Sequence, residues 1–79
     1  MTSEQLRVIR DASPFHPFTI HLADGRSLHV PHGDFLSVSP GGRTVIAYQA
    51  GEAFSVLDLL LVTELAVEGP QAPTDGEAA

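Results

Sequence analysis

The N-terminal part of the chain has the hydrophobic spacing of a helix. Leu6 and Ile9 lie one helical turn apart, with charged residues between and after them. Thr2 can cap this helix, while Gln5, three residues further on, can reach back to the cap. We therefore predict a helix over residues 3–12 with Leu6 and Ile9 facing the core, and the prolines that follow should end it.

Beyond these prolines the apolar residues recur at every second position, which is the period of a strand. A two-residue turn after this strand would place the apolar side chains of its partner on the opposite face. A three-residue loop that ends at Gly25, in a left-handed conformation, avoids this conflict. The hairpin is therefore predicted to pair Ile20 with Leu28 and Phe18 with Val30, which makes one face wholly apolar.

A second hairpin follows a short strand predicted over residues 35–39. Its strands are predicted over residues 44–49 and 53–57, on either side of a loop at Gly51. A three-residue loop again brings like side chains to one face. The residues that we expect on the core face are Ile46, Tyr48, Phe54 and Val56. The residues left on the opposite face are Val45, Ala47 and Leu57.

Residues 53–67 fit two kinds of secondary structure. Ser55 could cap a helix, and leucines at positions 57, 61 and 65 nearly keep helical spacing. Several β-branched residues, among them Val62 and Val67, favour strands instead. We therefore predict a strand, a tight turn over residues 58–61 and a further strand.

Together these elements predict one mainly β domain with an N-terminal helix, an α+β fold with about five antiparallel strands in a small barrel or curled meander. The domain is expected to cover residues 1–68, with strands between residues 18 and 67. A chain of 79 residues leaves no room for a second domain. Residues 69–79 contain no apolar residue larger than alanine, and we predict a disordered acidic tail there.

The order of elements resembles that of the Sm-like and SH3-like small β-barrels, because of the strand number, the LADGR corner at residues 22–26 and the tight turn before the last strand. The chain is also similar to a group of short bacterial proteins, which share the pattern seen here as PFHPFTIHLADGR, DFLSVSPGGRTVI and LDLLLVTELAV over most of residues 14–67. This second resemblance implies no activity. Sm-like proteins bind RNA through specific loop residues with basic or aromatic contacts, and the sequence contains no matching motif.

Composition argues against several classes of partner. Four arginines, no lysine and ten carboxylates give a net charge of −6, the wrong sign for a surface that neutralises phosphates. Non-specific nucleic-acid binding is therefore not expected. No continuous apolar stretch is long enough for a membrane span or a signal peptide, so we expect a cytoplasmic protein. Zero cysteines exclude disulfides and the commonest zinc sites.

Histidines form the one group of residues that suggests a chemical site. His29, His32 and Asp34 have the spacing H-x-x-H-x-D, and imidazole is the commonest transition-metal ligand. A metal site needs three or four ligands in a defined geometry, and the sequence does not show which other ligand would converge, so we interpret these three as surface residues. No cofactor is expected. The serines lack the sequence context of a nucleophile, so we predict no catalytic residue and no enzyme activity.

Surplus hydrophobic residues favour self-association. A core of this size supplies only about 3–5 kcal/mol, and small domains without disulfides or metals are often stabilised by association. The residues that we expect at a subunit contact are Val45, Ala47, Leu57, Leu59, Leu60, Leu61 and Val62. The alternative is that the N-terminal helix and the proline-containing segment after it cover this apolar face within one chain.

The resulting hypothesis is a non-enzymatic β module that self-associates, with a dimer favoured, and acts as a binding or scaffold subunit for an unidentified protein partner. Two alternatives remain open: a histidine-based metal-binding or pH-responsive protein, and a specific RNA binder of the Sm-like kind. RNA binding should weaken steeply with salt, whereas metal binding should raise the melting temperature.

Overall fold

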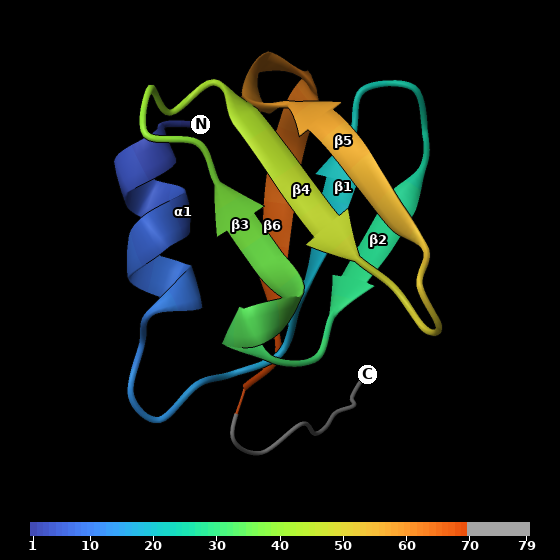
Figure 1. The fold of residues 1–79 in the computed structure, drawn as a ribbon. Helices are drawn as coiled ribbons and strands as arrows, with labels where there is room; N and C mark the ends of the chain where they lie inside the picture. The colour runs from blue at the N-terminus through green and yellow to red at the C-terminus, as the bar shows by residue number, and fades with distance from the viewer. Residues whose placement is uncertain (70–79) are drawn as a thin grey trace, which may run out of the picture.

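The computed structural model of the 79-residue chain describes residues 1–69. These residues contain one α-helix, α1 (Ser3–Arg10), and six strands in two antiparallel sheets of three strands each (Figure 1). Two short 3₁₀ helices, η1 (Gly33–Phe35) and η2 (Leu59–Leu61), lie between strands. The strands are β1 (Phe18–Leu22), β2 (Ser27–Val30), β3 (Leu36–Val38), β4 (Thr44–Tyr48), β5 (Phe54–Asp58) and β6 (Val62–Val67).

The predicted fold class, mainly β with one N-terminal helix, is confirmed. The strands number six rather than about five, and the described residues form two separate sheets, so the predicted barrel is not closed. The predicted disordered tail, apart from Gly69, lies outside the described residues. No helix within residues 1–69 has the length and hydrophobicity that crossing a membrane requires.

The back sheet has the strand order β2-β1-β6 and lies behind the other sheet in Figure 1. β1 and β2 pair in the predicted register, with Ile20 opposite Leu28 and Phe18 opposite Val30. The predicted loop is also confirmed, because Gly25 has a φ of 92°, a left-handed conformation that glycine adopts without steric cost. β6 pairs along the other edge of β1, so β1 is the central strand.

The front sheet has the strand order β3-β4-β5 and faces the viewer in Figure 1. β4 and β5 form the second hairpin around Gly51, whose φ is 74°. Ile46 lies opposite Val56 and Tyr48 lies opposite Phe54, so the register predicted from the odd loop is confirmed. β3 pairs along the other edge of β4.

Residues 53–67 form a strand, a turn and a strand, as predicted, and the helical alternative is wrong. Asp58 ends β5, and its Oδ1 accepts a hydrogen bond of 2.9 Å from the N–H of Leu60. A short carboxylate at this position satisfies a backbone donor of η2 that would otherwise lack a partner. The 3₁₀ turn thereby carries the chain from the front sheet to the back sheet.

Helix α1 lies beside β3 at one side of the two sheets (Figure 1). Its start is the predicted capping box: Thr2 Oγ1 accepts from the N–H of Gln5 at 3.1 Å, and Gln5 Oε1 accepts from the N–H of Thr2 at 3.0 Å. Arg7 is half-buried and donates a hydrogen bond of 2.7 Å to the carbonyl of Ser39. This bond ties the helix to the corner between β3 and β4.

The core lies between the two sheets and beneath α1. Phe18 and Ile20 of the central strand β1 are fully buried, as is Val45 of β4. Burying such a side chain stabilises a protein by about 1.5–3 kcal/mol relative to its exposure to water. The other members of this buried cluster are Leu6, Leu22, Val30, Leu36, Ala47, Leu57, Leu59 and Val62.

Candidate functional site

The outer faces of the two sheets differ in chemistry. On the back sheet, the outward-facing His21 lies opposite Ser27 on β2 and opposite Glu64 on β6, and its Nδ1 is 3.0 Å from the Ser27 hydroxyl. This face is therefore polar, as is usual for a sheet that contacts water. On the front sheet, the outward positions of β4 and β5 carry four large apolar residues. These residues, which we call the outer apolar face, are Ile46, Tyr48, Phe54 and Val56.

The outer apolar face consists of two cross-strand pairs. The rings of Tyr48 and Phe54 lie opposite each other with their centroids 6.3 Å apart, and Val56 lies opposite Ile46. The exposed fraction is 41% for Tyr48, 58% for Phe54 and 61% for Val56, whereas Ile46 is half-buried. Adjacent exposed aromatic and aliphatic side chains of this kind are typical of protein–protein contacts.

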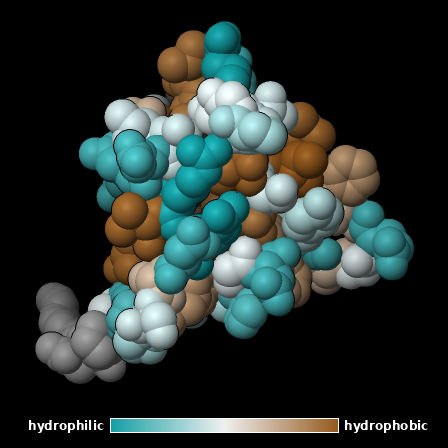
Figure 2. Space-filling view, turned by 60° about the vertical axis from the view of Figure 1, so that its left-hand side comes forward, coloured by the Kyte–Doolittle hydropathy of each residue, from teal (hydrophilic) through white to brown (hydrophobic). Residues whose placement is uncertain are grey.

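The space-filling view shows the molecule from the side of α1 (Figure 2). The front of Figure 1 has turned to the right in this view, and hydrophobic side chains reach the surface at the upper right, above a group of hydrophilic side chains. Toward the viewer, hydrophilic side chains are interleaved with hydrophobic ones. The apolar surface at the right belongs to the side of the molecule formed by the front sheet.

The structure exposes the face of the β4–β5 hairpin that we predicted to line the core. The predicted contact residues Val45, Ala47 and Leu57 are only 0%, 2% and 4% exposed and belong to the core. Leu59 and Val62 are each 5% exposed and are buried in the same cluster. The predicted interface is therefore wrong for these five residues, because their side chains already pack inside the protomer.

The third strand determines which face of the hairpin is buried. β3 pairs with β4 so that Leu36 lies opposite Ala47 and Val38 lies opposite Val45, while Ser37 between them is exposed. Burying the other face would place the Ser37 hydroxyl in the core and turn Leu36 and Val38 toward water, at a cost in free energy. The sequence contains this signal in residues 36–38, but the hairpin considered alone has two apolar faces and does not reveal it.

Two predicted contact residues are exposed. Leu60 is 72% and Leu61 is 48% exposed, and both belong to η2. The carbonyl of Leu61 accepts a hydrogen bond of 2.8 Å from the N–H of Ala23, which holds η2 against the loop between β1 and β2. η2 follows the end of β5, whereas Phe54 is the first residue of β5 and its cross-strand partner Tyr48 is the last residue of β4. These leucines are therefore an exposed apolar feature at the opposite end of β5 from the aromatic pair.

One edge of β5 has no partner strand within residues 1–69, because β4 alone pairs with it. The carbonyl of Ala53 and the N–H of Leu59 both bond toward the β4 side. Backbone groups along an antiparallel strand point alternately to its two sides. The backbone groups of Phe54 and Val56 therefore point to the open edge, directly beside their own exposed side chains.

The structure brings together two of the three candidate metal ligands, because His32 Nδ1 lies 3.6 Å from Asp34 Oδ2, but His29 does not join them. His29 lies on the outer face of the back sheet, with its Nδ1 3.5 Å from Thr19 Oγ1. His32 caps η1, since its Nδ1 accepts a hydrogen bond of 3.1 Å from the N–H of Asp34. Within residues 1–69, no group of three or more histidine or carboxylate side chains is placed to hold a metal ion.

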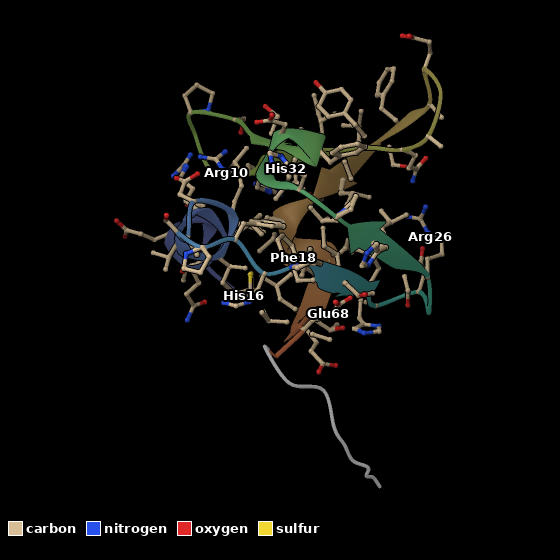
Figure 3. All side chains as sticks on the ribbon, turned by 90° about the horizontal axis from the view of Figure 1, so that it is seen from below. Arg10, His16, Phe18, Arg26, His32 and Glu68 are labelled. Carbon is tan, nitrogen blue, oxygen red and sulfur yellow. The ribbon has the colours of Figure 1, made fainter. Side chains whose placement is uncertain are left out.

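An open hollow of ≈ 600 Å³ lies between the end of α1 and η1. Arg10 and His32 both line it, and Figure 3 shows them on the same side of the molecule, away from His16 and Glu68. The guanidinium of Arg10 is bonded to both carboxylate oxygens of Asp11, at 2.8 and 3.2 Å. The arginine in this hollow therefore already has an anionic partner within the chain.

All four arginines are bonded within the chain. Each ion-paired carboxyl has a pKa below its usual range, because N–H groups of its arginine partner donate to it. An anionic ligand such as RNA would have to compete for these arginines, in a chain whose net charge is −6. The bonded pairs are Arg7 with the Ser39 carbonyl, Arg10 with Asp11, Arg26 with Asp24 and Arg43 with Asp58.

The features that the structure does bring together are the outer apolar face and the open edge of β5. Neither is a catalytic arrangement, and both are suited to contact with another macromolecule. Comparison of the chain with protein-family models, with curated proteins and with solved structures finds no match.

Proposed function

We propose that the chain is a non-enzymatic β module that self-associates and acts as a binding or scaffold subunit, with the outer apolar face and the adjoining edge of β5 as its contact surface. One observation carries this proposal: Tyr48, Phe54 and Val56 are exposed side by side, while the outer face of the other sheet is polar. These residues replace the buried ones as the centre of the contact.

The size of the chain supports the same proposal. Hydrophobic burial contributes about 25 cal/mol per Å² of apolar surface, and a small domain buries a smaller fraction of its surface than a large one. With 79 residues and no cysteine, this chain has a small core and no disulfide to supplement it. Covering Phe54 and Val56 with a second protein surface would add to the stability of the folded protomer.

Light scattering coupled to size exclusion tests this proposal on the full chain at micromolar concentration. We expect a mass at least twice the 8.4 kDa of one chain. Phe54→Glu should lower the mass toward that of one chain, because a carboxylate buried at the contact would lose its hydration. The matched control is His29→Glu on the polar back sheet, which should leave the mass unchanged. A wild-type chain that stays monomeric across this range would contradict the proposal.

A further inference from the structure

The geometry of β5 points to one particular mode of contact, an inference that rests on the proposed function. We propose that two copies of the chain pair antiparallel along their β5 edges, about a two-fold axis at Val56. The two three-stranded front sheets then form one continuous sheet. Each copy covers the other's open edge, so the assembly closes as a dimer.

Backbone geometry makes the β5 edge suitable for this pairing. Ala53 and Leu59 mark the residues that bond toward β4, and the register between them is regular. The N–H and C=O groups of Val56 therefore point outward at the middle of the strand. On the proposed axis, Val56 of each copy exchanges both hydrogen bonds with Val56 of the other. Phe54 then lies opposite Asp58 of the second copy, so this register overlaps all five residues of β5.

The apolar side chains of the front sheet are concentrated toward the same edge. β3, at the far side of the sheet, presents the exposed Ser37, and Ile46 on β4 is half-buried. Phe54 and Val56 on β5 are 58% and 61% exposed. A strand added beside β5 places its side chains about 4.5–5.5 Å from those of β5, and so covers the most exposed apolar residues of the front sheet. A sheet stacked on the whole outer face would also have to cover Ser37.

The distribution of charge favours pairing of two copies along β5 over pairing along β6, another edge strand. Two copies that each carry a net charge of −6 repel one another over most of their surfaces. Residues 53–57 carry no charge, and the carboxylate of Asp58 at the end of β5 is paired with Arg43 at 3.1 Å. β6, by contrast, has the exposed Glu64 within it. Edge strands in monomeric proteins are often protected by lysine, and this chain has none.

A single introduced cysteine tests the pairing, because the chain has no other thiol. Opposed residues that exchange both backbone bonds have Cα atoms about 5.5 Å apart, within the range that a disulfide spans. Mild oxidation of Val56→Cys should therefore give a disulfide-linked dimer. The matched control is Ser37→Cys, an exposed residue on the same face of the same sheet but on β3. Paired thiols act at millimolar effective concentration, so at micromolar protein Val56→Cys should cross-link at least about tenfold faster than Ser37→Cys.

A second variant tests the backbone contribution. Val56→Pro removes the N–H that points to the open edge and leaves intact the bonds of its neighbours to β4, and proline is tolerated at such edge positions. The dimer loses two hydrogen bonds, so its dissociation constant should rise at least about tenfold. Circular dichroism checks that the variant is folded. The Val56→Cys result decides the question if this variant does not fold.

These experiments distinguish the two proposals. If the wild-type chain is a dimer but the Val56→Cys variant cross-links no faster than the Ser37→Cys variant, edge pairing is overturned and the proposed function stands. A monomeric wild-type chain would overturn both. A dimeric wild-type chain together with rapid cross-linking of the Val56→Cys variant supports both the proposed function and edge pairing.

Discussion

Arg43 Nε donates a hydrogen bond of 3.1 Å to Asp58 Oδ1, where β4 begins and β5 ends. The same carboxylate oxygen accepts from the N–H of Leu60. The bond from Arg43 and then the bond from Leu60 hold the pKa of the Asp58 carboxyl below its usual range. The Asp58 carboxylate thus joins the β4–β5 hairpin to η2, the turn that leads into the back sheet.

This relationship predicts a dependence of stability on pH. A carboxyl whose pKa is lower in the folded than in the unfolded chain stabilises the fold above its unfolded pKa of about 3.9. That contribution is lost as the pH falls through the lower, folded pKa. Asp58→Asn should therefore lower the urea midpoint at pH 7, and the difference from wild type should shrink below about pH 4. Equal midpoints at pH 7 would show that the carboxylate has no such role.

Gly25 provides a test of the first hairpin. Its φ is 92°, and a Cβ built on it would have no atom within 4 Å, so a substitution there is opposed by the backbone conformation alone. Gly25→Val should destabilise the fold by more than about 1 kcal/mol in urea unfolding. Gly41→Ala is the matched control, since Gly41 also has open space around it but no left-handed φ, and should change stability by less than about 0.5 kcal/mol. Similar losses in both variants would mean that the left-handed conformation is not the cause.

Two leucines near η2 test which face of β5 is buried. Leu57 is 4% exposed and Leu60 is 72% exposed. Leu57→Ala should lower the free energy of unfolding by about 2–5 kcal/mol, as for other buried leucines. Leu60→Ala should change it by no more than about 0.5 kcal/mol. Chemical denaturation of the two variants under the same conditions measures both values, and a reversed order would contradict the inward orientation of Leu57.

The histidines test the metal-binding alternative. His29 belongs to β2 and His32 caps η1. Each Nδ1 is within hydrogen-bonding distance of a neighbouring group, Thr19 Oγ1 for His29 and the N–H of Asp34 for His32. The double variant His29→Ala, His32→Ala should therefore have the same response to zinc as the wild-type chain in a thermal melt. If zinc raised the melting temperature of the wild type but not of the variant, the metal-binding alternative would replace the present proposal.

Local patterns predicted the elements and registers of this fold well, and tertiary packing explains what they missed. The capping box at Thr2 and the conformation of Gly25 follow from a few neighbouring residues, so the sequence is sufficient for them. Which face of the second hairpin is buried depends on a third strand, because both faces are apolar. Ser37 on that strand distinguishes the two faces, because its polar side chain belongs on the exposed one. A prediction that took Ser37 into account would have placed Val45 inside and Val56 outside.

The open edge of β5 could be predicted only in part. Its strand and its partner β4 follow from the alternation around Gly51. The absence of a second partner within residues 1–69 follows from how the two sheets meet, which depends on the chain turning at η2 rather than continuing along β5. Local sequence patterns do not encode that arrangement.

The pairing of β1 with β6 has a consequence for how the chain folds. Phe18 lies opposite Val67, so the central strand of the back sheet obtains its second neighbour from the last strand that the structure describes. Contacts between residues so distant in sequence require closure of a long loop, and they slow folding relative to contacts between neighbours. During synthesis, the back sheet cannot be completed until Val67 has left the ribosome. Until then, one edge of β1 has no partner strand and the side chains of Phe18 and Ile20 are not fully buried, and exposed apolar surface and unpaired strand edges of this kind favour aggregation.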